Sequence, residues 1–379
     1  DNTAVGRQVL ANQQGASGNT AMGYRALYTN TGGIQNVGVG NSALLSNTTG
    51  ERNVAIGWRV ADANTTGSRN TAVGDHAFSD NTTGNYNVCM GSSSLSNNTT
   101  ASYNTAIGYE AMLNNTTGAS NVAVGKAAGN GLTTGDANTA IGVNTLYNNN
   151  AASNTAIGYS ALGWASGANN TAVGANSGEA ITTGSKNTAV GKSALAALTT
   201  GNENTAVGES ALLAATTGYN NVAIGFVAGY AITTGNSNVC VGESALASCQ
   251  TGYQNVAIGH LALSQYTGSA NVAVGNQALE DCTTGSSNCC VGHDAGRDIT
   301  TGSNNTAVGH AALDILSTGN YCTAIGHGAI GNGTGNSNTA VGQECMLDTT
   351  GGYQNTAMGR HALRAVSYTH LTLPTKRIV

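Results

Sequence analysis

Apolar and polar positions alternate along this chain in short segments that return at a fixed interval. Asn2–Gly6 reads Asn-Thr-Ala-Val-Gly, and it is the first of 22 related copies that end with Asn355–Gly359. Most copies follow one another at a 17-residue step, as from Asn2 to Asn19, and the step is one residue shorter in four of the 21 intervals. A period this regular is typical of a repeat architecture, in which each repeat packs on the next.

The alternation within one copy predicts a β-strand. With the first residue of each repeat as position 1, position 1 is Asn in 21 of 22 copies, position 2 is mostly Thr or Val, and position 3 is small. Position 4 is always Val, Ile or Met, and position 5 is always Gly. A period of two indicates a short strand. We expect the position-4 side chain to pack in the core, and the small residue at position 3 to face a close neighbour on the opposite face.

The rest of the repeat predicts turns and a second apolar element. Gly at position 5 permits positive φ or a close backbone approach. Position 6 is mixed and mostly polar, so we expect it to face solvent. Positions 8 and 9 are usually Ala-Leu, as in Ala43-Leu44, and most copies then close in a Thr-Thr-Gly turn such as Thr48–Gly50. We interpret Ala-Leu as a second short strand.

Two short strands and two glycine turns per repeat predict an all-β fold, a parallel β-solenoid (β-roll) of about 22 rungs with a 17-residue repeat. No run of ten residues within the repeats is free of Gly and turn residues, which argues against a helical solenoid. We assign residues 2–365 to one β-solenoid domain. Position 12 is Asn in early copies such as Asn47 and Asn64 and often apolar later, as in Ile232. We interpret this drift as a turn face that becomes a packed face.

Two columns of the repeat are predicted to be structural. Stacked rungs would place each position-1 Asn above the next, with amide bonded to amide as in ladders of identical strands. The position-5 glycines would form the turns. The ladder residues are Asn2, Asn19, Asn36, Asn53, Asn70, Asn187 and Asn204, and the turn glycines are Gly6, Gly23, Gly57, Gly74, Gly191 and Gly208.

The repeat pattern is lost near the end of the chain. Residues 366–379 read VSYTHLTLPTKRIV and contain the only proline. We interpret this tail as non-native, the translated read-through of a sequencing adapter in a metagenome assembly. The chain opens inside a repeat without an initiator Met, so we expect it to be a fragment of a longer protein.

Composition excludes several classes of partner. Charged residues are only 8% of the chain, its net charge is −5, and Lys and Arg are scattered singly, so we expect no nucleic-acid partner. No run of 18 apolar residues exists, so we expect no membrane span. Phe and Trp number two each. The interior must therefore be thin and built of Ala, Val, Ile and Leu.

The sequence contains few candidate catalytic or ligand-binding residues. The 18 acidic residues form no recurring close pair, and neither a Gly-x-Ser-x-Gly motif nor a phosphate-binding loop with Lys occurs, so we expect no catalytic residue, no cofactor and no enzyme. The eight cysteines fill mostly small or apolar columns, which indicates buried thiols. Since Cys-x-x-Cys is absent, they support neither a zinc site nor a redox motif.

Three histidines share position 6 on consecutive rungs: His293, His310 and His327. Stacked imidazoles could bind a transition metal or meet around a threefold axis. We favour the interpretation that position 6 is a variable surface position at which His recurs several times, because the pattern shows no carboxylate to orient the rings. We therefore assign no metal site.

The thin interior also predicts self-association. A core of positions 4 and 9 with a few methyl groups leaves little margin over the entropy of ordering the chain. The uncharged Ala column at position 3, including Ala189, Ala206 and Ala223, would form a flat stripe that is hard to leave in water. We expect association along this stripe, parallel and in register, most simply as a homotrimer.

The repeat Asn-(Thr/Val)-Ala-(Val/Ile)-Gly, with its Ala-Leu element and glycine turn, resembles the head repeats of trimeric autotransporter adhesins of the YadA type and related repeat regions of phage tail fibres. The likeness covers residues 2 to about 364. Its 17-residue period is longer than the usual adhesin head repeat, and its Thr-Thr-Gly turn also departs from that pattern. The resemblance implies a trimeric left-handed parallel β-roll, displayed on a bacterial surface or a virion tail, that touches a host.

Three functional classes follow. The first is a non-enzymatic extracellular rod that attaches to a host surface or a glycan receptor. The second is an ice-binding solenoid, because Thr is abundant, although its paired Thr residues are adjacent rather than at i and i+2 as a flat ice-binding strand needs. The third, a solenoid carbohydrate enzyme, lacks the grouped carboxylates that such chemistry requires.

Overall fold

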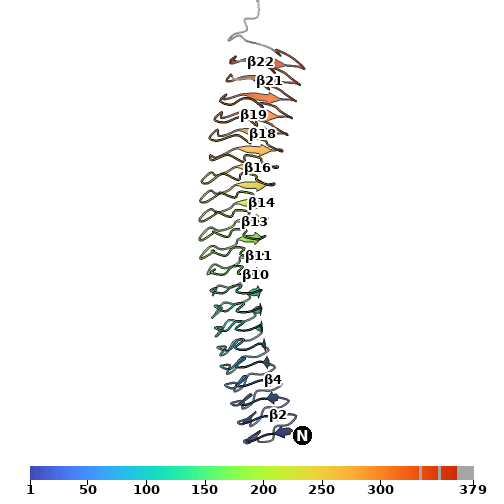
Figure 1. The fold of residues 1–379 in the computed structure, drawn as a ribbon, viewed down its shortest axis with the longest axis vertical. Helices are drawn as coiled ribbons and strands as arrows, with labels where there is room; N and C mark the ends of the chain where they lie inside the picture. The colour runs from blue at the N-terminus through green and yellow to red at the C-terminus, as the bar shows by residue number, and fades with distance from the viewer. Residues whose placement is uncertain (333–334, 349–350, 365–379) are drawn as a thin grey trace, which may run out of the picture. The chain divides into compact units, whose positions relative to one another are not determined.

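A computed structural model describes residues 1–332, 335–348 and 351–364. The chain divides into two compact units, which we call unit 1 (Asp1–Ser193) and unit 2 (Ala194–Val379). Each unit is a stack of similar coils, coloured from blue to green in unit 1 and from green to red in unit 2 (Figure 1). The predicted tail, residues 366–379, lies outside the described residues.

Every rung contributes one strand of three residues, at positions 2 to 4. The strands of unit 1 are β1 (Thr3–Val5), β2 (Thr20–Met22), β3 (Val37–Val39), β4 (Val54–Ile56), β5 (Thr71–Val73), β6 (Val88–Met90), β7 (Thr105–Ile107), β8 (Val122–Val124), β9 (Thr139–Ile141), β10 (Thr155–Ile157), β11 (Thr171–Val173) and β12 (Thr188–Val190). Those of unit 2 are β13 (Thr205–Val207), β14 (Val222–Ile224), β15 (Val239–Val241), β16 (Val256–Ile258), β17 (Val272–Val274), β18 (Cys289–Val291), β19 (Thr306–Val308), β20 (Thr323–Ile325), β21 (Thr339–Val341) and β22 (Thr356–Met358).

Within each unit, consecutive strands pair in parallel and in register. Ala55 of β4 lies opposite Ala72 of β5, and Ala257 of β16 lies opposite Ala273 of β17. Equivalent positions of successive rungs therefore form columns along the stack. The predicted all-β parallel β-solenoid, with about 22 rungs at close to a 17-residue spacing and no helix in the described residues, is confirmed.

The predicted second strand is wrong. Positions 6 to 11 form consecutive turns, because residues at positions 7 and 9 adopt the left-handed region, as in Ser42 (φ 57°) and Leu44 (φ 51°). An isolated L-residue pays roughly 1–2 kcal/mol for this conformation. Here the amide of Ser42 donates to Tyr24 O (2.9 Å) and that of Leu44 to Val60 O (3.0 Å). Hydrogen bonds to the rungs on both sides therefore hold a backbone that one rung alone would not keep.

The orientation predicted for the strand is also wrong. Position 3 points into the coil and positions 2 and 4 point out of it: Ala55 is 1% exposed, whereas Ile56, at position 4, is 40% exposed. Val73 and Val190, also at position 4, are partly exposed. The Ala column therefore packs inside its own chain and cannot be the assembly stripe.

The interior of each rung is filled by positions 3, 8, 9 and 12. Ala43 at position 8, Leu44 at position 9 and Asn47 at position 12 are all buried. In unit 2, Leu246 and Cys249 occupy positions 9 and 12 and are buried too. Position 12 thus points inward whether it is polar or apolar, and the predicted drift from a turn face to a packed face is wrong.

Candidate functional site: the strand face and its supporting ladders

The outer side of the strands is an apolar surface that recurs on every described rung. We call the side chains at positions 2 and 4 the strand face. Its position-4 side chains are partly or largely exposed on every described rung, for example Met90 (45%) and Ile224 (42%). No position 2 or 4 carries a charged residue. Because the strands pair in register, the strand face is a continuous stripe of Thr, Val, Ile and Met within each unit.

Lack of space inside the coil explains why the larger residues face outward. At position 3 of β3, where Gly38 replaces Ala, an added Cβ would lie 3.4 Å from Leu27 Cγ and from Ala43 O. Those distances suit a small side chain, and position 3 is Ala, Gly or Cys in every repeat. The leucines at position 9 already fill the interior, so a Val or Ile at position 3 would overpack it.

The position-1 Asn column forms a hydrogen-bonded ladder that differs in detail from simple amide stacking. Asn36 donates its backbone N–H to Asn19 Oδ1 (2.9 Å) and its Nδ2 to Gly50 O (2.8 Å) of its own repeat. A longer contact joins Asn36 Nδ2 to Asn19 Oδ1 (3.3 Å). Each side chain therefore both links two rungs and closes one. The bond from backbone N–H to Oδ1 recurs from Asn19 to Asn2, Asn53 to Asn36, Asn70 to Asn53, Asn187 to Asn170 and Asn221 to Asn204.

The position-5 glycines all have positive φ. The angle is 130° at Gly6, Gly23 and Gly191, 140° at Gly57, 139° at Gly74 and 135° at Gly208. Space is equally restrictive, since a Cβ on Gly23 would lie 2.5 Å from Gly40 O. Any side chain here would meet the backbone of the next rung, which cannot move away without breaking the pairing.

A second ladder, which the sequence analysis missed, runs through the Thr-Thr-Gly turns. Thr48 Oγ1 donates to Thr65 O (3.0 Å), and Thr65 Oγ1 donates to Thr82 O (2.9 Å). In unit 2, Thr283 Oγ1 donates to Thr300 O (3.1 Å). The recurrence of Thr as the first residue of these turns was the available signal.

Positions 9 and 12 compensate for one another. Position 9 is Gly in four rungs, and position 12 of those rungs is always Leu or Ile: Leu132, Ile181, Ile232 and Ile299. A Cβ on Gly229 would lie 2.9 Å from Leu212 Cδ2 and 3.1 Å from Ile232 Cδ1. In these rungs the position-12 side chain thus packs into the space that the position-9 Gly leaves open.

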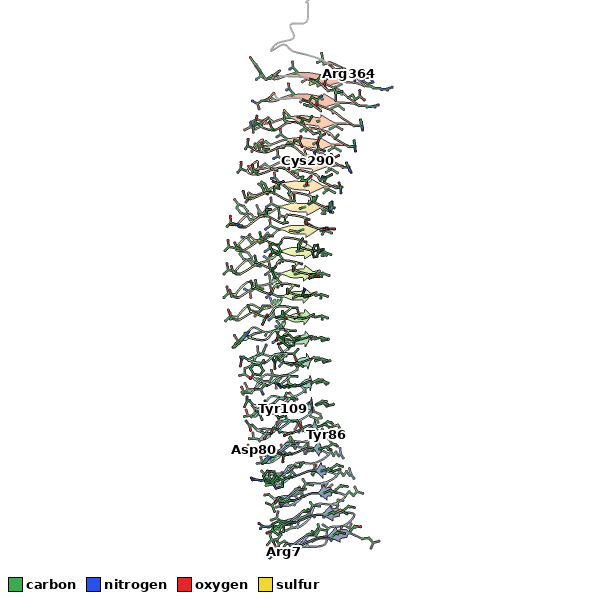
Figure 2. All side chains as sticks on the ribbon, viewed as in Figure 1. Arg7, Asp80, Tyr86, Tyr109, Cys290 and Arg364 are labelled. Atoms are coloured by element: carbon green, nitrogen blue, oxygen red, sulfur yellow. The ribbon has the colours of Figure 1, made fainter. Side chains whose placement is uncertain are left out.

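Unit 1 also carries a shallow groove of about 250 Å³ on its turn side. Tyr147, Trp164 and Glu179 line it together with Asn144, Ser160 and Gly163. Trp164 is 59% exposed and Tyr147 is 40% exposed. The two exposed aromatic rings thus lie beside amide and carboxylate groups. In Figure 2, Asp80, in the turn that follows β5, and Tyr86, two residues before β6, lie on opposite sides of the view.

The cysteines confirm the strand orientation. All eight are free, and all are buried except Cys289, the one at position 2. Cys290, its neighbour at position 3, is buried, and burial raises the pKa of its thiol. Cys322, which replaces the ladder Asn, donates its S–H to Gly335 O (3.2 Å) and its backbone N–H to Asn305 Oδ1 (2.9 Å). It therefore keeps part of the ladder.

The histidine column of unit 2 has the carboxylate that the sequence analysis did not find. His293 Nδ1 lies 2.7 Å from Asp294 Oδ2. The rings of His293 and His310 stack at 5.1 Å between centroids, and those of His310 and His327 at 5.0 Å. The argument that no carboxylate orients the histidines is therefore wrong for His293, because Asp294 follows it directly in a turn.

The fold and these columns define the class of the molecule, a parallel β-solenoid repeat protein. No protein-family model matches the chain, and no curated protein matches it. Within the described ranges, no helix is long and apolar enough to cross a membrane.

Proposed function

We propose that this chain is the non-enzymatic structural shaft of a surface adhesin or phage tail fibre, that it acts as a parallel homotrimer, and that it works outside the cell on a bacterial surface or virion tail. The observation that carries the proposal is the strand face. The resemblance of the repeats to YadA-type heads and tail-fibre regions supports the same role.

The extent of the strand face argues for a protein partner. Unit 1 repeats the exposed pair of positions 2 and 4 along twelve strands. The largest contiguous apolar patch on a typical monomer is only about 300–600 Å², and this stripe continues over twelve strands. A stripe made of regularly spaced columns is best covered by another with the same spacing, which a second copy of this chain supplies.

A parallel arrangement in register suits this surface. Neighbouring strands lie roughly 4.8 Å apart, so two copies side by side can interdigitate their position-4 side chains rung by rung. Association about an axis parallel to the stack would bury the stripe of every copy. Three copies are the smallest closed arrangement in which each stripe meets two others, as in the resembling adhesins.

Molecular mass in solution tests this assembly. We expect light scattering on the full chain to give three times the chain mass. Ile258→Glu with Val274→Glu places two carboxylates on the strand face and should give a folded monomer or a mixture of smaller species. The matched control, Thr284→Glu with Thr301→Glu, lies on the exposed turn side and should leave the mass unchanged. A monomeric wild-type chain, or equal dissociation of both variants, would refute the assembly.

The groove around Trp164 is our proposed contact for a host glycan receptor. A sugar ring could lie on the exposed faces of Trp164 and Tyr147, with its hydroxyls bonded to Glu179 and Asn144. A glycan array probed with the wild-type chain should give hits that Trp164→Ala abolishes. The control Trp58→Ala removes another exposed indole of unit 1 and should keep the hits. Retention of the hits by Trp164→Ala would remove the groove from the proposal.

An ice-binding role is the second candidate, and one observation favours it. The second Thr of the turns is exposed on successive rungs, at Thr49, Thr66, Thr83 and Thr100. The register of the rungs therefore spaces these hydroxyls regularly. Thermal hysteresis by the purified chain, lost on Thr66→Lys with Thr83→Lys, would establish this role in place of attachment, and its absence would exclude it.

A further inference from the structure

We propose that His293, Asp294 and His310 in unit 2 form a binding site for one divalent transition-metal ion, of which Zn²⁺ is the simplest example. One ligand atom of each residue lies within 4.8 Å of the others. Imidazole nitrogen and carboxylate oxygen are ligands that Zn²⁺ prefers, at about 2.0–2.2 Å. The site does not depend on the proposed attachment function.

The register of the solenoid brings the ligands together. His293 and His310 occupy position 6 of successive rungs, so they are neighbours although a full repeat separates them along the chain. Asp294 is at position 7, in the left-handed region (φ 56°), and its carboxylate turns back to His293. The two imidazoles are exposed, so they can move the short distance from 4.8 Å to the roughly 3.3 Å between neighbouring ligands of a tetrahedral ion.

The local charge favours a cation. Asp294, Asp298 and Asp314 surround a single guanidinium, that of Arg297. Arg297 makes its shortest contact with Asp298 (2.9 Å), and its contact with Asp294 Oδ1 is 3.9 Å. Asp294 Oδ1 is buried and has no hydrogen-bond partner. Burial raises the pKa of the Asp314 carboxyl, Arg297 lowers it, and the nearby Asp298 and Asp294 carboxylates raise it again.

When the metal ion binds, it replaces one hydrogen at the site. The ion takes the place of the hydrogen between His293 Nδ1 and Asp294 Oδ2: this proton leaves to solvent, solvent returns one to Nε2, and the imidazole that binds the ion stays neutral. His310 supplies the third ligand from the next rung. A hollow of about 250 Å³ lined by His310, His327 and Asp314 adjoins the site and has room for water to complete the coordination. No bond is made or broken other than to the ion and the protons.

Calorimetric titration of the untagged full chain with Zn²⁺ tests the proposal. We expect one equivalent per chain to bind, and His310→Gln and Asp294→Asn each to weaken the affinity by about tenfold or more. Co²⁺ in place of Zn²⁺ should give a visible absorption band that both variants lose. Because His310 is exposed, His310→Gln should fold normally, and its thermal midpoint checks this.

His260→Gln is the matched control. His260 lies in the same column, but its Nδ1 faces the Asn276 amide at 3.2 Å instead of a carboxylate. This variant should bind Zn²⁺ like the wild type. Absence of Zn²⁺ binding by the wild-type chain would overturn the proposal, as would an affinity that His310→Gln leaves unchanged or that His260→Gln lowers equally.

Discussion

The early repeats of unit 1 and the repeats of unit 2 fill the same interior position in opposite ways. In unit 1, Asn30, Asn47, Asn64, Asn81 and Asn98 stand at position 12 and are buried. Each donates its Nδ2 to the preceding Oδ1 where a preceding Asn exists, as from Asn64 to Asn47 (2.8 Å). In unit 2 the described part of the same column reads Leu198, Ala215, Ile232, Cys249, Tyr266, Cys282, Ile299 and Leu316, and all of these are buried.

This difference shows that the same backbone accepts either Asn or apolar side chains at position 12, in runs of successive rungs that carry the same kind of side chain. From Asn30 to Asn98 each Asn of the column bonds to the next, and in unit 2 the apolar side chains pack together in the same place. The side-chain ladder ends one rung before the last Asn. Asn98 Oδ1 and Asn115 Oδ1 are buried without a hydrogen-bond partner, and Leu132 follows Asn115 in the column. Each such group costs roughly 1–3 kcal/mol.

The largest effect on stability should come from substitutions of the position-5 glycines, which both regions share. Gly91 in unit 1 and Gly242 in unit 2 have φ of 133° and 128°, and a Cβ on either would lie 2.5 Å from the carbonyl oxygen of the next position-5 glycine. Gly91→Ala and Gly242→Ala should each lower the local free energy of opening by about 3 kcal/mol or more. Hydrogen exchange of the flanking rungs measures this. Gly163→Ala, whose Cβ would lie 3.5 Å from Ser160 O, should have little effect. Unequal losses at Gly91 and Gly242 would mean that the interior chemistry does alter the backbone.

An Asn placed in the apolar column should be the next most costly change. Ile232→Asn removes a fully buried side chain and puts an amide between Ala215 and Cys249, which offer it no side-chain amide. We expect a loss of about 3 to 4 kcal/mol in the same hydrogen-exchange experiment. The control Ile232→Val should cost only about 1 kcal/mol. An Asn variant as stable as the Val variant would show that the column does not need matched neighbours.

The reverse change should cost less. Asn64→Leu breaks the bonds to Asn47 (2.8 Å) and Asn81 (2.7 Å), but the interior accepts Leu at position 12, as Leu198 and Leu316 show. We expect a loss of about 2 kcal/mol, confined to the rungs that adjoin Asn64. Replacing Asn47, Asn64 and Asn81 together should cost less than the sum of three single changes, since fewer amides are then left unpaired. A strictly additive loss would contradict the ladder account.

The period of the repeat and its two nearly invariant residues made the solenoid predictable. A 17-residue step with Asn at position 1 and Gly at position 5 excluded long helices and located the strand at positions 2 to 4. The choice of inner face was not predictable from the alternation, since a period of two fits either face. Hydrophobicity favoured Val and Ile inside, but the volume already taken by Leu44 and its equivalents left room only for small residues such as Ala and Cys.

The turn geometry and the histidine site could not be predicted for a different reason. Left-handed residues such as Ser42 and Leu44 are not types that favour positive φ, and only bonds to both neighbouring rungs stabilise them. The contact of Asp294 with His293 depends on one of these turns. The stacking of His293 on His310, in contrast, follows from the period alone.

Two adjacent cysteines on β18 allow the most direct test of the central claim, that the strand face is the assembly surface. Cys289 is exposed at position 2, and Cys290 is buried at position 3 with a thiol pKa raised by burial. Alkylation rates of both thiols, measured by mass spectrometry on the wild type and on Ile258→Glu with Val274→Glu, report on each face separately. The account predicts that Cys289 reacts slowly in the wild type and much faster in the double variant, while Cys290 stays protected in both. Rapid alkylation of Cys289 in the wild type, or of Cys290 in either protein, would contradict it.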